Sequence, residues 1–520
     1  MFLRRIASPS YSPLLAKVRL ISAMPPDNLG FGFGFSEALK PSEDADRLSQ
    51  ILIQHHNPFH ALESSLQLSG VRISSHLVLQ TLLRLRNLSK IALSFFTWVH
   101  HQPDYCPDVP AYDLMIDIMS KVRQFDVAWQ LLVEMRQRGQ DPTPNTFAIL
   151  IRRYVAAGMS RQAVRAFDDM GSFLDRKPDL CHLNFLLDTL CKYGYVMIAT
   201  EIFHKRRSEY EPDVKTYTVL IYGWCKIGRF PMAEKFLREM IDRGLEPNVV
   251  TYNVLLNGLC RRSSLHPETR FERTIQAADN LFDEMRKRGV EPDVMSYSIV
   301  LHVYSRAHKP DLTLWKFKLM KENGICPTVV TYTSVIKCLC SCGRLEDAEK
   351  FIDEMVEDGV YPTAATYNCF FKEYRGRKDV DSALKLYRKI RGSSILSESL
   401  LSIHSYNILV GMVSRLGRME IVRELWNDMT ENGVGPDLDS YTLLIHGLCE
   451  KQKWRDACHY FVEMIEMGFL PQQITFETLY KGLIQSDMLR TWRRLKNKLE
   501  EESLKFGMDF QQYSVQPYRR

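Results

Sequence analysis

The stretch Val329–Thr363, VVTYTSVIKCLCSCGRLEDAEKFIDEMVEDGVYPT, contains two short apolar runs with helical spacing. Gly343 separates the two runs, and a residue without a Cβ is well suited to the end of a helix. Pro362 follows the second run and stops it. The stretch therefore predicts a pair of helices whose apolar faces exceed what one pair alone can bury.

The same pattern recurs about every 35 residues along most of the chain. An aromatic residue followed by a small polar residue marks the start of each first helix. This marker is seen at Tyr217-Thr218, Tyr252-Asn253, Tyr332-Thr333, Tyr367-Asn368, Tyr406-Asn407 and Tyr441-Thr442. A fixed period predicts an all-α solenoid of helix-turn-helix repeats, because stacking buries the apolar faces of successive pairs. Function is then expected on a surface built from equivalent positions of successive repeats.

The repeats can be placed in one register. They span residues 109–143, 144–179, 180–213, 214–248, 249–293, 294–328, 329–363, 364–402, 403–437 and 438–472. We expect a degenerate capping repeat at 73–108 and a partial repeat with a cap at 473–507, because end repeats cover the exposed core of an array. Two repeats exceed the period, and we place their surplus in loops near residues 262–271 and 392–402.

The repeat consensus V-T-Y-N-x-L-I-x-G-L-C-K-x-G-R-x-x-x-A-x-x-x-F-x-E-M-x-x-x-G-x-x-P-D is nearly intact in Val214–Asn248 and Val249–Asp293. It resembles the pentatricopeptide repeat, and the array is similar to the pure-array (P-type) subclass. Tetratricopeptide repeats instead carry Trp and Leu-Gly in the first helix. The resemblance covers more than two thirds of the chain. It implies a right-handed superhelical solenoid that binds single-stranded organellar RNA.

The N-terminal segment is typical of an organelle-targeting signal. Residues 1–30 are rich in Arg, Lys and Ser and contain no acid before Asp27. We expect a cleavable transit peptide and a mitochondrial location, with the chloroplast as the alternative; an untargeted N-terminus stays open. A partly helical extension should follow at residues 31–72, and residues 508–520 should form a tail. No apolar run reaches the length of about 18 residues that a membrane-spanning helix needs, so we expect no membrane insertion.

Two positions of each repeat, counted from its first residue, carry small hydrogen-bonding side chains. The fifth position holds Asp113, Ala148, Asn184, Thr218, Asn253, Ser298, Thr333, Asn368, Asn407 and Thr442. Helix stability does not demand Asn or Thr there, whereas an amide or hydroxyl can read an unstacked base, one per repeat. The last position holds Thr143, Asp179, Asp213, Asn248, Asp293, Thr328, Thr363, Ser402, Asp437 and Gln472. At that position base reading and ordinary helix N-capping both stay open.

The resemblance implies a base code for these pairs. In the family, Asn with Asp favours uracil, Thr with Asn favours adenine, Thr with Asp favours guanine, and Asn with Ser or Asn favours cytosine. Carried over in register from residue 180 to residue 472, the code implies the target U-A-U-R-R-Y-U-R, where R is a purine and Y a pyrimidine. The pairs Asp113/Thr143 and Ala148/Asp179 depart from the code.

The resemblance also implies that the second position supplies apolar wedges between which bases sit. Val250, Met295 and Val330 fit this role, whereas Lys215 and His404 do not. The stripe of aromatic residues at the fourth position could stack on bases. We interpret it as core instead, because the neighbouring fifth residue already faces the groove.

Charged residues also follow the repeat. The formal charge of +6 falls to about +2 without the basic residues of the predicted transit peptide, so their distribution matters more than their sum. The end of the first helix holds Lys121, Lys192, Lys226, Arg261, Arg306 and Arg415, and the second helix holds Glu134, Asp169, Glu239, Glu284, Glu354, Asp428 and Glu463. A basic stripe can contact a phosphate backbone, and Lys192, Lys226 and Arg261 are expected to do so. A solvated surface with salt bridges is the alternative.

Patterns that would indicate catalysis or metal binding are weak. Five cysteines recur late in the first helix and are interpreted as small core residues: Cys191, Cys225, Cys260, Cys340 and Cys449. The motif His266-Pro267-Glu268 matches half of a zinc-deaminase signature, but no P-C-x-x-C follows it. We therefore expect no enzymatic activity, no cofactor, no metal and no small-molecule substrate.

The favoured function is sequence-selective binding of single-stranded RNA in a plant organelle. By occupying its target, the chain would support transcript stabilisation, processing, splicing or translation. Ribosomal or RNA-processing proteins are candidate partners. An architectural subunit of the mitochondrial ribosome and a protein-binding solenoid without RNA are the alternatives.

Overall fold

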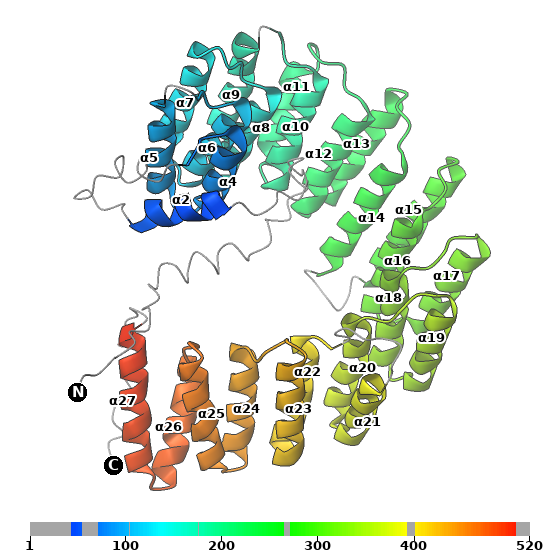
Figure 1. Cartoon of the computed structure of the whole chain (residues 1–520). Coiled ribbons are helices and arrows are strands. Elements are labelled where there is room, and N and C mark those ends of the chain that lie inside the picture. The colour runs from blue at the N-terminus through cyan, green and yellow to red at the C-terminus, as the bar shows by residue number, and fades with distance from the viewer. Residues whose placement is uncertain are drawn as a thin grey trace, which may run out of the picture. The chain divides into compact units, whose positions relative to one another are not determined.

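The computed structural model describes residues 43–54, 71–102, 105–174, 176–264, 271–392 and 401–505. These residues form helices and connecting segments, with no strand among them. They belong to two compact units, residues 1–261 and 262–520, which are described separately (Figure 1). The predicted transit peptide, the predicted tail and the His266-Pro267-Glu268 motif lie outside the described residues.

The first unit is a stack of helix pairs. Its helices are α2 (Glu43–Gln54), α4 (Ser75–Arg84), α5 (Ser89–His100), α6 (Val109–Lys121), α7 (Phe125–Gln137), α8 (Pro144–Ala156), α9 (Ser160–Phe173), α10 (Leu180–Lys192), α11 (Val196–Arg206), α12 (Val214–Lys226), α13 (Phe230–Asp242) and α14 (Val249–Ser264). The first helices of successive repeats pack on one another, as α6 on α8 and α10 on α12 do, and each second helix packs on the first helix of its repeat. At the N-terminal end, α4 and α2 continue the stack.

The second unit has the same organisation. Its helices are α15 (Phe271–Lys287), α16 (Val294–Arg306), α17 (Pro310–Glu322), α18 (Val329–Ser341), α19 (Leu345–Glu357), α20 (Ala364–Arg377), α21 (Val380–Arg391), α22 (Ile403–Leu416), α23 (Met419–Glu431), α24 (Leu438–Glu450), α25 (Trp454–Glu466), α26 (Gln473–Gln485) and α27 (Leu489–Lys505). The first helices α16, α18, α20, α22, α24 and α26 pack on one another in this order. The described residues therefore confirm an all-α solenoid of helix pairs, and no described helix is long and apolar enough to cross a bilayer.

The helix pair predicted from Val329–Thr363 is present as α18 and α19. Thr328 caps α18 in a reciprocal capping box with Thr331, which satisfies two backbone N–H groups at the start of the helix. Gly343 has a φ of 80° and Gly359 a φ of 75°, a left-handed conformation that glycine adopts without strain. Local sequence thus determines where each helix begins and ends.

The long repeat 249–293 differs from the prediction. Its helices α14 and α15 contain 16 and 17 residues, whereas α12 and α13 contain 13 each. The surplus therefore lengthens both helices instead of lying only in a loop. Ser263 stands where Gly228 follows α12 with a φ of 75°. The missing glycine does not set the length of α14, because Arg123 and His308 take a positive φ at the same position after α6 and α16, which contain 13 residues each.

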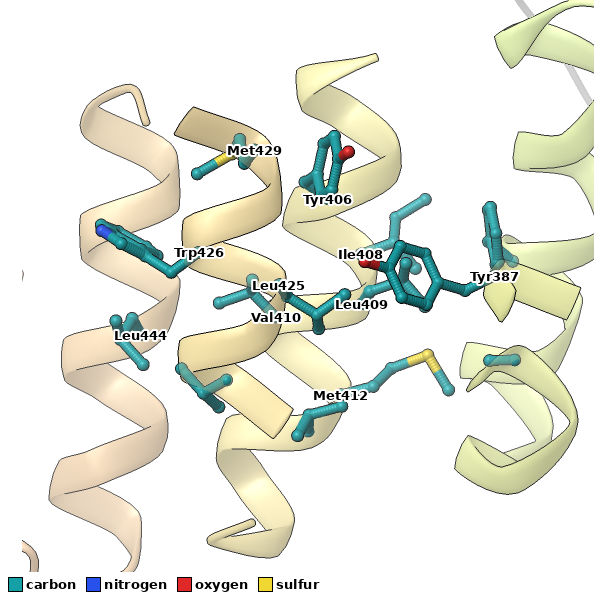
Figure 2. Packing of buried hydrophobic residues seen from close by; sticks show 14 of the residues in the cluster. Tyr387, Tyr406, Ile408, Leu409, Val410, Met412, Leu425, Trp426, Met429 and Leu444 are labelled. Atoms are coloured by element: carbon teal, nitrogen blue, oxygen red, sulfur yellow. The ribbon is translucent and has the colours of Figure 1, made fainter. Parts of the chain in front are cut away.

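The aromatic stripe lies in the core, as predicted. Tyr217, Tyr252 and Tyr332 are fully buried, and their equivalents in the other repeats are buried as well. Figure 2 shows this packing in the second unit, where the Trp426 ring of α23 faces α24 and meets Tyr441 edge-on with ring centroids 5.1 Å apart. Successive repeats are therefore held together by large aromatic side chains that solvent cannot reach.

Glycines at the tenth position bring neighbouring first helices close together. A Cβ built on Gly258 would lie 2.4 Å from Sγ of Cys225, and one on Gly223 would lie 2.5 Å from Sγ of Cys191. The cysteines fill the space that these glycines leave, and burial raises the pKa of the Cys191 thiol to about 12. This packing explains why small residues recur late in the first helix.

Candidate nucleic-acid interface

The second, fifth and ninth positions lie on one face of each first helix, because they follow the spacing i, i+3, i+7. At the second position, Val250, Met295 and Val330 are each more than half exposed. Ile474 occupies the same position in the partial repeat and is equally exposed, although the sequence interpretation did not include it. Large apolar side chains in water at equivalent positions suit contact with a ligand.

The fifth side chains are less open than the sequence suggested. Asn184 is only 1% exposed, and Asn407 and Asn368 are also buried. Each lies at the seam between its own first helix and that of the next repeat, where its polar atoms meet the N-terminus of the next helix. Thr218, Asn253, Thr333 and Thr442 are half-buried.

Hydrogen bonds bring the fifth residue of one repeat to its last residue. Nδ2 of Asn184 donates to Oδ1 of Asp213 at 3.1 Å, and Oγ1 of Thr216 donates to Oδ1 of Asn184 at 2.7 Å. Asp213 also caps α12 by accepting from the backbone N–H of Thr216 at 2.8 Å. Partial burial opposes ionisation of Asp213, but these hydrogen bonds outweigh it and lower its pKa. N-capping and contact with the fifth residue are thus made by the same carboxylate.

The same arrangement recurs in the second unit. Nδ2 of Asn407 donates to Oδ1 of Asp437 at 3.2 Å, and Oγ of Ser440 donates to Oδ1 of Asn407 at 2.5 Å. Nδ2 of Asn368 contacts Oγ of Ser402 at 3.4 Å. Two side chains about thirty residues apart in sequence are therefore held together at the repeat seam.

Repeats with Thr or Ser at the fifth position use other partners. Oγ1 of Thr218 lies 2.8 Å from Oγ1 of Thr251, and Oγ1 of Thr333 lies 3.0 Å from Oγ1 of Thr366. Ser298 donates to a carbonyl of its own helix. Oγ1 of Thr442 is buried without a hydrogen-bond partner among the described residues. Direct bonding of the two code positions is thus seen in the pairs Asn184/Asp213, Asn368/Ser402 and Asn407/Asp437.

Asp113, which departs from the base code, is buried and bonded to the next repeat. It accepts hydrogen bonds from Oγ1 of Thr146 at 2.5 Å and from Nδ2 of Asn145 at 2.9 Å. Burial raises its pKa despite these two bonds. Asp113 therefore has a structural role at the seam of the first repeat, and this role does not require contact with an RNA base.

The basic stripe predicted at the end of the first helix is largely engaged within the protein. Lys192 forms an ion pair with Asp188 at 2.7 Å, and Lys226 donates to the backbone carbonyl of Lys192. A cation at the C-terminus of a helix also interacts favourably with its dipole. Arg261 is exposed. These residues serve the stacking of repeats in addition to any contact with a phosphate backbone.

The acidic stripe has a structural role at the core. Glu239 accepts a hydrogen bond from the hydroxyl of Tyr217 at 3.2 Å, and Glu463 accepts one from Tyr441 at 2.9 Å. Burial and then Glu239 raise the pKa of Tyr217 to about 12. Glu239 and Glu463 thus satisfy tyrosine hydroxyls that would otherwise be left without these partners.

The ninth position was missed by the sequence interpretation. In three consecutive repeats of the second unit it holds the exposed residues His302, Lys337 and Lys372. The signal that could have found them is their distance of seven residues from the second position, which places both on the same helix face.

Comparisons with known proteins agree on one family. The model described as "PPR repeat family" matches residues 107–156, 212–261, 327–376, 401–450 and 440–485, and the model "Pentatricopeptide repeat domain" matches residues 280–341. A mitochondrial pentatricopeptide repeat-containing protein of Arabidopsis thaliana is 60% identical over 93% of this chain and 93% of its own length. Another from the same organism, also named mitochondrial, is 31% identical over 91% of this chain and 78% of its own length.

Among solved structures, pentatricopeptide repeat protein PPR10 from maize aligns with 89% of this chain and 79% of its own, at 17% identity and a TM-score of 0.40. The sequence relationship is the stronger of the two, because it extends at 60% identity over nearly the whole of both chains. The chain therefore belongs to the pentatricopeptide repeat family.

Proposed function

We propose that this chain binds single-stranded RNA with sequence selectivity and acts by occupying its target. The observation that carries the proposal is the repeated seam at which the fifth and the last side chain of a repeat meet. The pairs Asn184/Asp213 and Asn407/Asp437 share this geometry in different units. Polar pairs recur along this surface at a regular spacing. Single-stranded RNA suits such a surface, because its bases also recur regularly and differ in their hydrogen-bonding edges.

The seam would hold one base in a fixed orientation. The bond to Asp213 uses one N–H of the Asn184 amide and leaves the other for a base edge. In the second unit, Oδ1 of Asn368 is buried and has no hydrogen-bond partner among the described residues, so it is an acceptor in need of a donor. Exposed second residues such as Val330 would cover the faces of the base. No turnover is involved in this action.

A substitution at one fifth position tests base reading. With Asp437 unchanged, Asn407→Thr is expected to shift the preference of that repeat from uracil toward guanine. Fluorescence anisotropy with labelled U-A-U-A-A-C-U-A and with the same RNA carrying G for the seventh base measures the shift. A good pair of polar contacts discriminates by about 1–3 kcal/mol, or roughly 10-fold to 100-fold.

The matched control is Ser298→Thr, which changes the fifth position of another repeat in the same unit and should leave the preference at the seventh base unchanged. Equal affinity of the wild-type chain for every single-stranded RNA would contradict sequence selectivity. Absence of RNA binding would contradict the function as a whole.

We propose that the chain acts in mitochondria. The support is the basic N-terminal segment together with the mitochondrial designation in the names of two relatives that align with most of the chain. RNA crosslinking and immunoprecipitation from isolated mitochondria tests location and target together. A short footprint that matches U-A-U-R-R-Y-U-R is expected. Broad recovery of ribosomal RNA would instead favour an architectural subunit of the ribosome.

A further inference from the structure

Resting on the proposed RNA binding, we infer that the phosphate backbone is held mainly by an exposed row of cations on the first helices of residues 294–437. The row consists of the cations Lys337, Lys372 and Arg375, flanked by the exposed imidazoles of His302 and His404, and we call it the cation row. It extends along α16, α18, α20 and α22, which pack consecutively in the second unit. The phosphate backbone of the RNA would therefore be bound mainly in one part of the array.

The cation row lies on the helix face that carries the proposed base contacts. In three successive repeats the second, fifth and ninth residues are Met295–Ser298–His302, Val330–Thr333–Lys337 and Ala365–Asn368–Lys372. These positions share one face of an α-helix, and the ninth residue lies about 10 Å along the axis from the second. A nucleotide whose base meets the second and fifth side chains would thus present its phosphate toward the ninth.

Members of the row are close enough to affect each other's ionisation. Burial, then Lys337 and Arg306, lower the pKa of His302. Burial raises the pKa of the Cys369 thiol to about 11, while the charges of Lys337 and Lys372 both oppose this rise. Cations that lie this close together repel one another, so an anion placed among them would be attracted by several charges at once.

His404 links the row to the next repeat. Burial, then Lys372 and Arg375, lower its pKa. At the second position it was expected to weaken base clamping, because it is not apolar. Because Lys372 and Arg375 act on it, its side chain instead lies where an anion would be attracted.

The cations of the row are not neutralised by carboxylates. Lys337, Lys372 and Arg375 form no ion pair within the part of the chain that the structure describes. The neighbouring Glu373 pairs with Arg377 at 2.8 Å instead. An unpaired cluster of exposed cations lowers stability through mutual repulsion, which binding of a polyanion would relieve.

Two repeats of the first unit carry the opposite charge at the same position, although Arg152 in the repeat between them is basic. Their ninth residues are Asp117, paired with Arg153 at 2.7 Å, and Asp188, paired with Lys192 at 2.7 Å. A phosphate would meet carboxylates there. Such contact is therefore expected to be uneven along the array, although every repeat has the same backbone.

The test compares two double variants of the full chain. The first, Lys337→Gln with Lys372→Gln, removes two charges from the cation row. The control, Lys318→Gln with Lys350→Gln, removes two charges from exposed side chains on the second helices α17 and α19. Binding of labelled U-A-U-A-A-C-U-A is measured by anisotropy over a series of NaCl concentrations, and folding is checked by circular dichroism.

The slope of log affinity against log salt should become less steep by about 1.4 in the first variant, because each phosphate contact on a single strand contributes about 0.7. The slope of the control should equal that of the wild type. Equal slopes for all three proteins, or an equal decrease in both variants, would overturn the cation row while leaving RNA binding intact. Failure of the wild-type chain to bind would overturn the proposed function as well.

Discussion

Equivalent positions of the two units have the same backbone but different surroundings. In the first unit, the second-helix acid Glu239 is 25% exposed and accepts from one tyrosine hydroxyl, that of Tyr217. In the second unit, the equivalent Asp428 is 6% exposed and accepts from two, those of Tyr387 and Tyr406. The ninth position differs too: Asp117 and Asp188 of the first unit are ion-paired acids, whereas Lys337 and Lys372 of the second form no ion pair among the described residues.

This contrast shows that a repeat fixes where a side chain is located but not what it does there. Positions that stack one repeat on the next are uniform, because each must fit the same neighbour. Positions on the exposed face have no such requirement, so their charge can differ from repeat to repeat. Substitutions at the uniform stacking positions and at the variable exposed positions test this contrast, and they are given in order of decreasing expected effect.

Substitution of Asp428 and substitution of Glu239 should differ most in their effect on the free energy of unfolding. Asp428→Ala leaves the hydroxyls of Tyr387 and Tyr406 and the cation of Arg391 without their shared carboxylate. Loss of one partner from a buried charged network costs about 3–5 kcal/mol of unfolding free energy. Glu239→Ala should cost about 1 kcal/mol, because the site is more exposed. Urea unfolding followed by circular dichroism compares them, and equal losses would show that the environments do not differ in energy.

Glycine substitutions test the positions that stack one repeat on the next, which are alike in the two units. A Cβ on Gly223 would lie 2.5 Å from Sγ of Cys191, and one on Gly447 would lie 2.3 Å from Oγ of Ser414. Both Ala variants should lose about 1–3 kcal/mol through overpacking, less the helix propensity gained.

The control for these variants is Gly411→Ala. Its Cβ would meet Leu443 at an ordinary distance of 3.6 Å, so the gain in helix propensity should make this variant more stable. Thermal unfolding of the three variants shows whether each substitution raises or lowers the stability of the protein. If Gly411→Ala is destabilised as much as the others, close approach of the helices is not the cause.

A charge reversal in the first unit should make it resemble the second. Asp188→Lys replaces an acid at the ninth position and breaks its ion pair with Lys192. RNA affinity at low salt should rise by roughly 10-fold, since a hydrogen bond to a charged group is worth about 1.5 kcal/mol. Anisotropy measures the gain, and Asp169→Lys on the second helix serves as the matched control. A gain of the same size in the control would indicate attraction by net charge alone.

Acid should weaken the seams in a predictable direction. The pKa of Asp213 is lowered on folding, so its contribution to stability is present above the unfolded value of about 3.9 and is lost as the pH falls through the lower folded value. Asp213→Asn should therefore be less stable than the wild type at neutral pH, with the difference vanishing in acid.

Asp113 provides a test of the opposite sign. Burial raises its pKa, so its carboxyl favours folding below the unfolded value and this benefit is lost as the pH rises through the folded value. Asp113→Asn should gain stability at neutral pH. Urea unfolding at a series of pH values measures both variants, and changes of the same sign would refute the assigned environments.

Much of the architecture could be predicted because the responsible signals are local. The period, the N-cap residues and the left-handed residue after the first helix, which is glycine in several repeats, all act within a few neighbouring residues. The fifth and last positions were also identified from the sequence, although their contact across the seam was not.

The sequence by itself determined the family, the helix pairs and the identity of the side chains on the exposed face, because periodicity and capping are properties of short segments. Only the tertiary structure decided which charges are available. Lys226 is used to cap a neighbouring helix and Glu239 to satisfy a buried hydroxyl, whereas Lys337 and Lys372 form no ion pair with any residue that the structure describes. The physical reason is that burial and hydrogen bonding depend on the repeat packed alongside, which a single repeat does not encode.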